Sequence, residues 1–537
     1  MLTLTLPRTG PSALQHAVET RPRATTEWLA RLPFASPVDA AQQLLGALYA
    51  LNRHALGEDE RYALLPLYRP AVARAAASLE ILLAGAGVPP LAQQQQTGTL
   101  LRELRIEHGI SYKHVLQAMV SRAAGHPGPS RRLAEVTARL IAAQRDVLIA
   151  CYQTYSQPPA GLWLELHQLY QLACAAEVAD LAVDDALPAS LAYRQALLLA
   201  LADPPHMSQT ELVHARMFLD KFGALAVLQA ATGQHAGKGF AVVVDCDRGP
   251  SPIPIKLKEN DLWLDTEMLR RQLHEAAVRL QAGDSPRRIG LPPSMDKSLS
   301  RSLSKHLLKL WHTGSQRVFS RYSAAGSTLQ LAAGVSAIHR LLEQVPQAPE
   351  LNADAGTDDI DDADDNLDIH DLNPLMAPSV VVNTSHWAVI NDSAAGLALS
   401  GTPDAPLNLK VGDALALRPD AATDWSLGVI RWIRMQDSRS VELGVQRLSP
   451  HLQPVWVRPL RGQRKASPEP ALFIPGVPAL QQPDRLLLPR NIYQPGMDAV
   501  VWHAPRQYTL TFGRRHEHTP NFDLIDFTIF ASEHPHD

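Results

Sequence analysis

The chain has few cysteines and no long apolar run. Both features limit the classes of protein to which it can belong. Cys151, Cys174 and Cys246 are odd in number and widely spaced, which argues against a disulfide framework or a zinc site and favours buried free thiols. No run of about 18 apolar residues is present, and the start MLTLTLPRTG has no basic region followed by a long apolar one. We therefore expect neither a membrane span nor a signal peptide. The sequence predicts a cytoplasmic protein.

Positive charge is not in excess either. The chain has 50 lysines and arginines against 54 aspartates and glutamates, for a net charge of −4. This balance argues against a generally basic nucleic-acid binder, although it leaves room for a local basic patch. The hydrophobic fraction of 46% is sufficient for folded cores, and the length predicts about three or four domains.

Residues 1–235 have a helical pattern almost throughout. Apolar residues recur at helical spacing, and alanine and leucine dominate, which suits helices packed on helices. Ser36-Pro37 is typical of a helix start, and Ser208-x-x-Glu211 reads as a capping box. We predict an all-α scaffold domain of about seven or eight helices.

The composition changes after this region. A β-branched run at 240–245, a short apolar run from Asp261, and helical patterns at 266–280 and 295–311 predict a small α+β module over residues 236–345. Eleven acidic residues and no lysine or arginine follow between Glu343 and Asp371. This composition predicts an acidic, disordered linker at 346–376.

The predicted α+β module contains a basic stretch that directly precedes this acidic linker in the sequence. Nine basic residues and one acidic residue lie between Arg287 and Leu342. Four of the basic residues recur at every fourth position, so they share one face of a predicted helix: Lys297, Arg301, Lys305 and Lys309. Like charges at this spacing disfavour the helix. An anion or an acidic partner, such as the linker, would relieve the repulsion, but a solvated amphipathic face explains the pattern equally well.

Residues 377–460 read as short alternating strands with a polar turn, Asn391-x-Ser393-x-x-Gly396, between two of them. This combination resembles the PilZ family, small β-barrels with which bacteria sense cyclic di-GMP. The resemblance implies that Asn391 and Ser393 face the guanine edges and that Gly396 permits a tight backbone. An alternative is an ordinary β-turn, because Asn and Ser bond their own backbone.

The resemblance also implies an upstream Arg-x-x-x-Arg pair that clamps the phosphates. Between Arg340 and Lys410 the chain has no lysine or arginine. Binding in a non-standard way would need other cations, and Arg458, Arg461 and Arg464 directly follow the barrel. Residues 461–537 contain further alternating strands and form either a small β domain or an extension of the barrel.

The sequence contains none of the common catalytic motifs. A Walker-type loop, a dinucleotide-binding fingerprint, a His-Glu-x-x-His pair and a Gly-x-Ser-x-Gly turn are missing. Asp245 and Asp247 follow a predicted strand, but Gly249-Pro250 after them favours a β-turn. The C-terminal histidines have no accompanying cysteines. We predict no catalytic residue, no metal and no cofactor, with cyclic di-GMP as the one small ligand in question.

A DNA-binding segment is the remaining alternative. The run from Glu107 to His114 has a pattern typical of a helix-turn-helix, and the adjacent predicted helix carries Arg102 and Arg105. The acidic total weighs against DNA binding.

The whole pattern predicts a non-enzymatic bacterial effector or adaptor that couples cyclic di-GMP to protein partners. The alternatives are a protein-binding scaffold that has lost the nucleotide and a DNA-binding regulator. We expect nucleic acid to be no partner and the protein not to insert into a membrane.

Overall fold

The computed structural model divides the chain into two units, Met1–Val318 with Ile433–Ser440, and Phe319–Trp432 with Val441–Asp537. The residues that it describes are 2–10, 19–231, 239–251, 257–314, 322–323, 326–343, 384–393, 395–402, 407–436, 440–461, 464–465, 467–477, 482–503 and 506–533. The predicted acidic linker at 346–376 lies outside these residues, so its predicted disorder stays a prediction.

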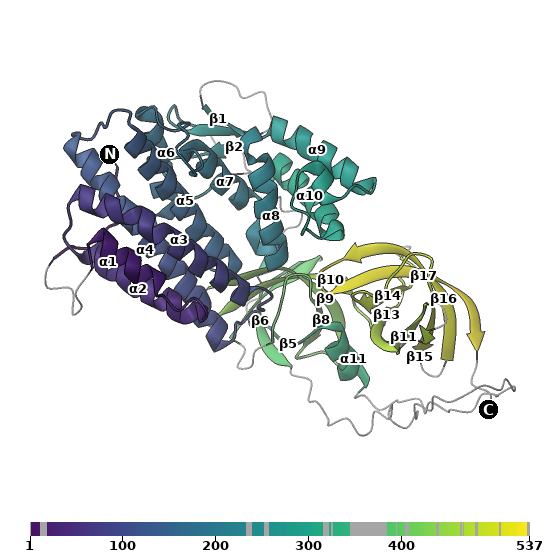
Figure 1. The fold of residues 1–537 in the computed structure, drawn as a ribbon. Helices are drawn as coiled ribbons and strands as arrows, with labels where there is room; N and C mark the ends of the chain where they lie inside the picture. The colour runs from purple at the N-terminus through teal and green to yellow at the C-terminus, as the bar shows by residue number, and fades with distance from the viewer. Residues whose placement is uncertain are drawn as a thin grey trace. The chain divides into compact units, whose positions relative to one another are not determined.

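The first unit is built mainly from helices, as the sequence predicts (Figure 1). The helices are α1 (Pro22–Ala30), α2 (Pro37–Arg53), α3 (Glu58–Leu83), α4 (Ala92–Arg122), α5 (Arg131–Gln153), α6 (Leu162–Ala175), α7 (Ala189–Leu201) and α8 (Gln209–Phe222), with short 3-10 helices at Pro204–His206 and Gly223–Leu225. Helix α4 packs against α2, α3 and α5. The helical array is therefore confirmed.

Two helices begin at the residues that the sequence predicts. Ser36 precedes α2, whose first residue is Pro37. The Ser208 hydroxyl accepts a hydrogen bond from the Glu211 amide at the start of α8, and the Glu211 carboxylate accepts one of 2.8 Å from the Ser208 amide. Such caps satisfy amide groups that have no partner within the helix.

The helix-turn-helix that the sequence left as an alternative is absent from this part of the described chain. Helix α4 continues unbroken through 107–114. Gly109 lies inside it, where an added Cβ would be 3.7 Å from the Cβ of Ala143 on α5. Glu107 is buried and accepts a 2.7 Å hydrogen bond from the side chain of Asn52. The glycine thus serves close helix packing, and the polar side chain of Glu107 is bound within the unit.

A small antiparallel sheet completes the first unit, with strand order β1-β3-β2. Its elements are β1 (Val227–Ala230), β2 (Gly239–Val242) and β3 (Leu262–Asp265), followed by α9 (Glu267–Gln281), a 3-10 turn at Pro286–Ile289, and α10 (Lys297–Thr313). Phe240, Leu273 and Leu307 lie in the same hydrophobic core as the residues of α5 to α8. Strands of four residues are too short to form a core of their own. The residue boundaries of the five predicted domains stay a prediction.

The second unit begins with a closed six-stranded antiparallel barrel. Its strands are β5 (Thr328–Ala333), β6 (Ser385–Ser393), β7 (Gly396–Gly401), β8 (Ala414–Pro419), β9 (Ser426–Met435) and β10 (Val441–Ser449), with β4 (Tyr322–Ser323) added beside β6 and α11 (Val335–Glu343) following β5. The order around the barrel is β6-β5-β8-β9-β10-β7, and β7 pairs back to β6. Strand β5 therefore belongs to this barrel, although its sequence lies on the other side of the acidic linker.

A second barrel follows, with order β11-β13-β14-β17-β16-β15 and with β15 pairing back to β11. The strands are β11 (Gln453–Arg461), β12 (Arg464–Lys465), β13 (Glu469–Ile474), β14 (Arg485–Pro489), β15 (Asp498–His503), β16 (Arg506–His518) and β17 (Phe522–Glu533). Leu510, Phe512 and Ile525 point into its core, as the period of two predicts. Of the two predicted alternatives, the structure shows a separate closed barrel.

The two barrels share a hydrophobic cluster. Helix α11 packs against strands of both. The buried members of the cluster include Ile338 of α11, Leu427 and Val429 of the first barrel, and Leu472, Leu487, Phe522 and Leu524 of the second. The outer faces of some strands are thus buried in a common core.

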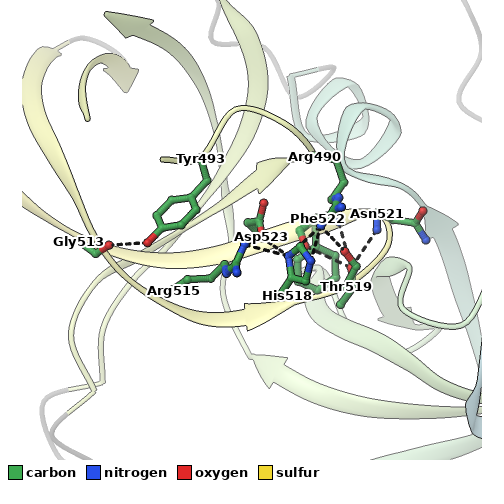
Figure 2. A network of polar contacts seen from close by, with 9 residues as sticks. All are labelled: Arg490, Tyr493, Gly513, Arg515, His518, Thr519, Asn521, Phe522 and Asp523. Carbon is green, nitrogen blue, oxygen red and sulfur yellow. Dashed lines mark hydrogen bonds and ion pairs between the residues drawn. The ribbon is translucent and has the colours of Figure 1, made fainter. Parts of the chain in front are cut away.

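Polar contacts at the β16–β17 turn extend this junction (Figure 2). His518 Nδ1 lies 2.6 Å from an oxygen of Asp523, which is 3% exposed. The Thr519 hydroxyl accepts a 3.1 Å hydrogen bond from the Asn521 amide. The Asn521 side chain in turn donates a 2.5 Å hydrogen bond to Asp413 of the first barrel. The turn of one barrel therefore contacts a loop of the other.

The cysteines are free thiols, but only one of them is buried. Cys151 is buried, Cys246 is half-buried and Cys174 is exposed. The prediction of buried thiols is therefore confirmed for Cys151 alone, and it is wrong for Cys174. It lies on the solvent side of α6, whose opposite side enters the core. None of the helices in the described ranges is long and apolar enough to span a membrane.

Candidate functional site

The predicted ligand turn lies at the tip of the β6–β7 hairpin. Asn391 is on β6 opposite Ala398 of β7, and Ser393 pairs with Gly396. The register of β6 shifts between Val389 and Asn391, and such an irregularity bends a strand and re-aims the side chains after it. The structure thus brings Asn391, Ser393 and Gly396 together at one end of the first barrel.

Ser393 and Gly396 close the turn on themselves. The Ser393 hydroxyl donates a 2.9 Å hydrogen bond to the Gly396 carbonyl and accepts one of 3.2 Å from the Gly396 amide. A Cβ added to Gly396 would lie 2.2 Å from the carbonyl oxygen of Val445 on β10. Glycine is required here because the backbones of β7 and β10 approach too closely for a side chain. Ser393 thus has a local role in the β-turn. The side chain of Asn391 has no hydrogen bond to another described residue.

Arg447 of β10 binds the residue between the two predicted ligand residues. Its guanidinium donates to both carboxylate oxygens of Asp392, at 2.7 and 3.1 Å, and to the Ser393 carbonyl at 2.7 Å. The hydrogen bonds and charge of Arg447 lower the pKa of Asp392 below its usual value. Arg447 was not predicted as a site residue, because nothing in its local sequence distinguishes it from other arginines on a strand.

The spacing Arg-x-x-x-Arg, absent between Arg340 and Lys410, occurs immediately before β4, at Arg317 and Arg321. Both residues lie outside the described part of the chain. Strand β4 itself pairs with β6, with Tyr322 opposite Asp392. The residue after Arg321 in sequence is therefore opposite the centre of the ligand turn. The spacing could have been found from the sequence, but the acidic linker separates it from the turn.

The cations predicted to follow the barrel lie on β11 and β12 of the second barrel. The guanidinium of Arg458 lies 5.0 Å from the centre of the Trp502 ring. Arg461 pairs with Arg464 in the β11–β12 hairpin, but their side chains are outside the described residues. No hydrogen bond or ion pair joins Arg458 to the β6–β7 turn among the residues that the structure describes. The role of these three residues as phosphate ligands stays a prediction.

The basic face of α10 forms a separate surface in the first unit. Lys297, Lys305 and Lys309 are exposed, and none of them has an ion pair with a described residue. Arg301 is half-buried, and its Nε donates a 2.6 Å hydrogen bond to the carbonyl of Leu280 at the end of α9. Three of the four predicted cations are thus available to solvent, and the fourth holds α10 against α9.

The carboxylates after β2 have structural partners. Asp247 accepts hydrogen bonds from the amides of Gly161 at 2.6 Å and Trp163 at 3.0 Å, and so caps the start of α6. Asp245 forms an ion pair with Lys258. Among the described residues, no group of three or more His, Cys, Asp and Glu side chains is arranged to hold a metal ion.

Comparisons with known proteins give the same domain order as the structure. The model of the N-terminal domain of the cyclic-di-GMP receptor FimW matches residues 23–232, that of its middle PilZ domain matches 240–362 and 378–454, and that of its C-terminal beta-barrel domain matches 455–530. The chain is 28% identical to the cyclic-di-GMP receptor FimW of Pseudomonas aeruginosa over 559 residues, which cover 94% of this chain and 90% of that protein. No solved structure matches the chain.

Proposed function

The chain belongs to the PilZ family through its middle domain, and on this premise we propose that it is a cytoplasmic cyclic-di-GMP receptor with no catalytic activity. The observation that carries the proposal is the Asn391-x-Ser393-x-x-Gly396 turn at the tip of a β6–β7 hairpin in a closed barrel. The FimW models describe a receptor rather than an enzyme, which supports the same conclusion.

We propose that Arg317 and Arg321 supply the phosphate contacts. Cyclic di-GMP carries two negative charges, and a guanidinium can bond two oxygens of one phosphate at once. The pair precedes β4, and β4 pairs with the residues of the turn, so its place in the sequence fits the family's arrangement. This is a simpler source of cations than Arg458, Arg461 and Arg464, which follow the barrel in sequence.

Asn391 and Ser393 would then contact the guanine edges. An asparagine amide offers donors and an acceptor, which match the mixed donors and acceptors of a guanine base. Ser393 would have to give up, or share, its hydrogen bonds with Gly396 when the ligand binds. Ser393→Ala therefore has two effects, loss of a ligand contact and loss of the turn's own bond.

We also propose that the receptor passes its signal to an acidic partner through α10. The three exposed lysines of α10 favour this class of partner over nucleic acid, because they form one short face in a chain of net charge −4. If the barrel binds no nucleotide, the same surface would serve a scaffold that binds protein alone.

Calorimetric titration of the full chain with cyclic di-GMP tests the receptor proposal. We expect binding by the wild type, and its loss both in Arg317→Ala/Arg321→Ala and in Asn391→Ala/Ser393→Ala. The matched control is Arg458→Ala/Arg461→Ala, which removes two cations from the second barrel and should bind like the wild type. Loss of binding in the control alone would instead favour the non-standard mode. The absence of any binding heat at low and moderate salt would leave the protein-binding scaffold.

A further inference from the structure

We propose that Arg447 is a positioning residue of the cyclic-di-GMP site, which holds the Asn391-x-Ser393-x-x-Gly396 turn in its binding shape and neutralises Asp392. This inference rests on the proposed function in one respect, the identity of the ligand. Its contacts are those of a clamp: two hydrogen bonds to the Asp392 carboxylate and one of 2.7 Å to the Ser393 carbonyl. The Arg447 backbone amide also donates a 3.0 Å hydrogen bond to the carbonyl of Ala395.

The backbone contacts of Arg447 fall on the part of the turn that the ligand would use. Its guanidinium holds the carbonyl of Ser393, and its own amide holds the carbonyl two residues later. One residue of β10 therefore fixes the hairpin tip at two points. Holding a binding group in its bound conformation reduces the entropy that association would otherwise cost.

Charge gives a second reason for this residue. Asp392 lies between the two predicted base-contacting residues, and its charged carboxylate would repel the dianionic ligand. Arg447 compensates that charge with two parallel N–H···O bonds, the geometry in which arginine binds a carboxylate best. An aspartate is already ionised at neutral pH, so the charge of Asp392 would meet the ligand if Arg447 did not compensate it.

Stability alone is a weak reason for the ion pair. The side chains of Arg447 and Asp392 are 41% and 42% exposed, and ion pairs in such surroundings usually contribute about 0–1 kcal/mol. A role in binding therefore accounts better for an ion pair at this position. The proposed ligand is itself charged, so the net charge of the pair affects the electrostatic attraction between the ligand and the turn.

The test is a double-mutant cycle on the full chain, read by calorimetry with cyclic di-GMP. Arg447→Gln should weaken binding on the order of 5- to 30-fold, the factor that about 1–2 kcal/mol gives. Adding Asp392→Asn to Arg447→Gln should restore part of the loss, because the unpaired carboxylate is then gone. Arg447→Lys should fall between, since it keeps the charge and loses the bidentate geometry. Raising salt should reduce the difference between Arg447→Gln and the wild type.

Arg431→Gln is the matched control. Arg431 is on the adjacent strand β9 and donates hydrogen bonds to Gln446 at 2.7 Å and to Glu517 at 2.6 Å. Among the described residues it has no hydrogen bond or ion pair to the turn. If Arg431→Gln weakens binding as much as Arg447→Gln, general charge loss explains the effect and the proposal fails. It also fails if Asp392→Asn gives no rescue, or if Arg447→Gln binds like the wild type. A wild type that binds no cyclic di-GMP would refute the receptor proposal instead, which separates the two.

Discussion

Asp413 is predicted to make the stability of the barrel pair depend on pH. Its carboxylate accepts a 2.7 Å hydrogen bond from the Lys410 amide and a 2.5 Å one from the Asn521 side chain of the second barrel. Burial at this junction raises the pKa of Asp413 from 3.8 to about 7, against the opposing effect of those hydrogen bonds. The folded state therefore binds the proton more tightly than the unfolded chain does.

The magnitude follows from the two pKa values. The stabilisation is complete below about pH 4 and is lost as the pH rises through about 7. Moving the pKa over this interval corresponds to at most about 4 kcal/mol. Asp413 keeps some contact with solvent, so we expect roughly 1–3 kcal/mol after screening. Asp413→Asn should remove this dependence. The stability of the variant relative to the wild type should therefore be greater at pH 8 than at pH 5.

Urea unfolding followed by pulsed hydrogen exchange can measure this effect. The peptides that contain β8 and β17 report the barrels separately from the helical unit. The quantity of interest is the difference in unfolding free energy between wild type and Asp413→Asn at each pH, because all other titrating groups cancel in it. Equal differences at pH 5 and pH 8 would refute the assignment of a raised pKa to Asp413.

Three further predictions concern other parts of the molecule. Gly396→Ala should destabilise the barrel by about 1–3 kcal/mol, because the new Cβ would lie 2.2 Å from a backbone oxygen of β10. The control is Gly46→Ala, where a Cβ meets nothing within 4 Å. Equal melting temperatures for the two variants would contradict the claim. Asp247→Ala should cost about 1 kcal/mol through loss of a helix cap, seen as faster amide exchange in the first turn of α6, and unchanged exchange would count against it. Glutamine in place of the three exposed lysines of α10 should abolish salt-sensitive retention on an anionic column without changing the far-UV circular dichroism; retention equal to that of the wild type would exclude this face.

Local patterns predicted the fold well where the relevant residues are neighbours in sequence. The helix start at Pro37 follows from the preference for proline in the first helical turn, and the start at Gln209 follows from capping. The alternation along β16 follows from the period of two. The pairing of strands that are far apart in the sequence could not be predicted from such local patterns. Strand β5 pairs with β6 and β8 across a linker whose composition says nothing about pairing. In the sequence, Gly109 suggests a turn. Its actual role is to let α4 pack closely on α5, and this packing is visible only in three dimensions.

The candidate site was predictable in part for the same reason. Asn391, Ser393 and Gly396 are close in sequence, so their pattern could be read directly. Arg447 reaches the turn because β10 pairs with β7, a fact of barrel order rather than of local sequence. The Arg317 and Arg321 spacing was readable, but its relation to the turn depends on the β4–β6 pairing.

The hydrophobic cluster that both barrels share with α11 has a practical consequence for anyone who wishes to isolate the first barrel. Cutting the chain after β10 would expose Leu427 and Val429 to water, together with the apolar side of α11. Exposed surfaces of this kind favour aggregation. A fragment that contains the first barrel should therefore retain the residues through β17.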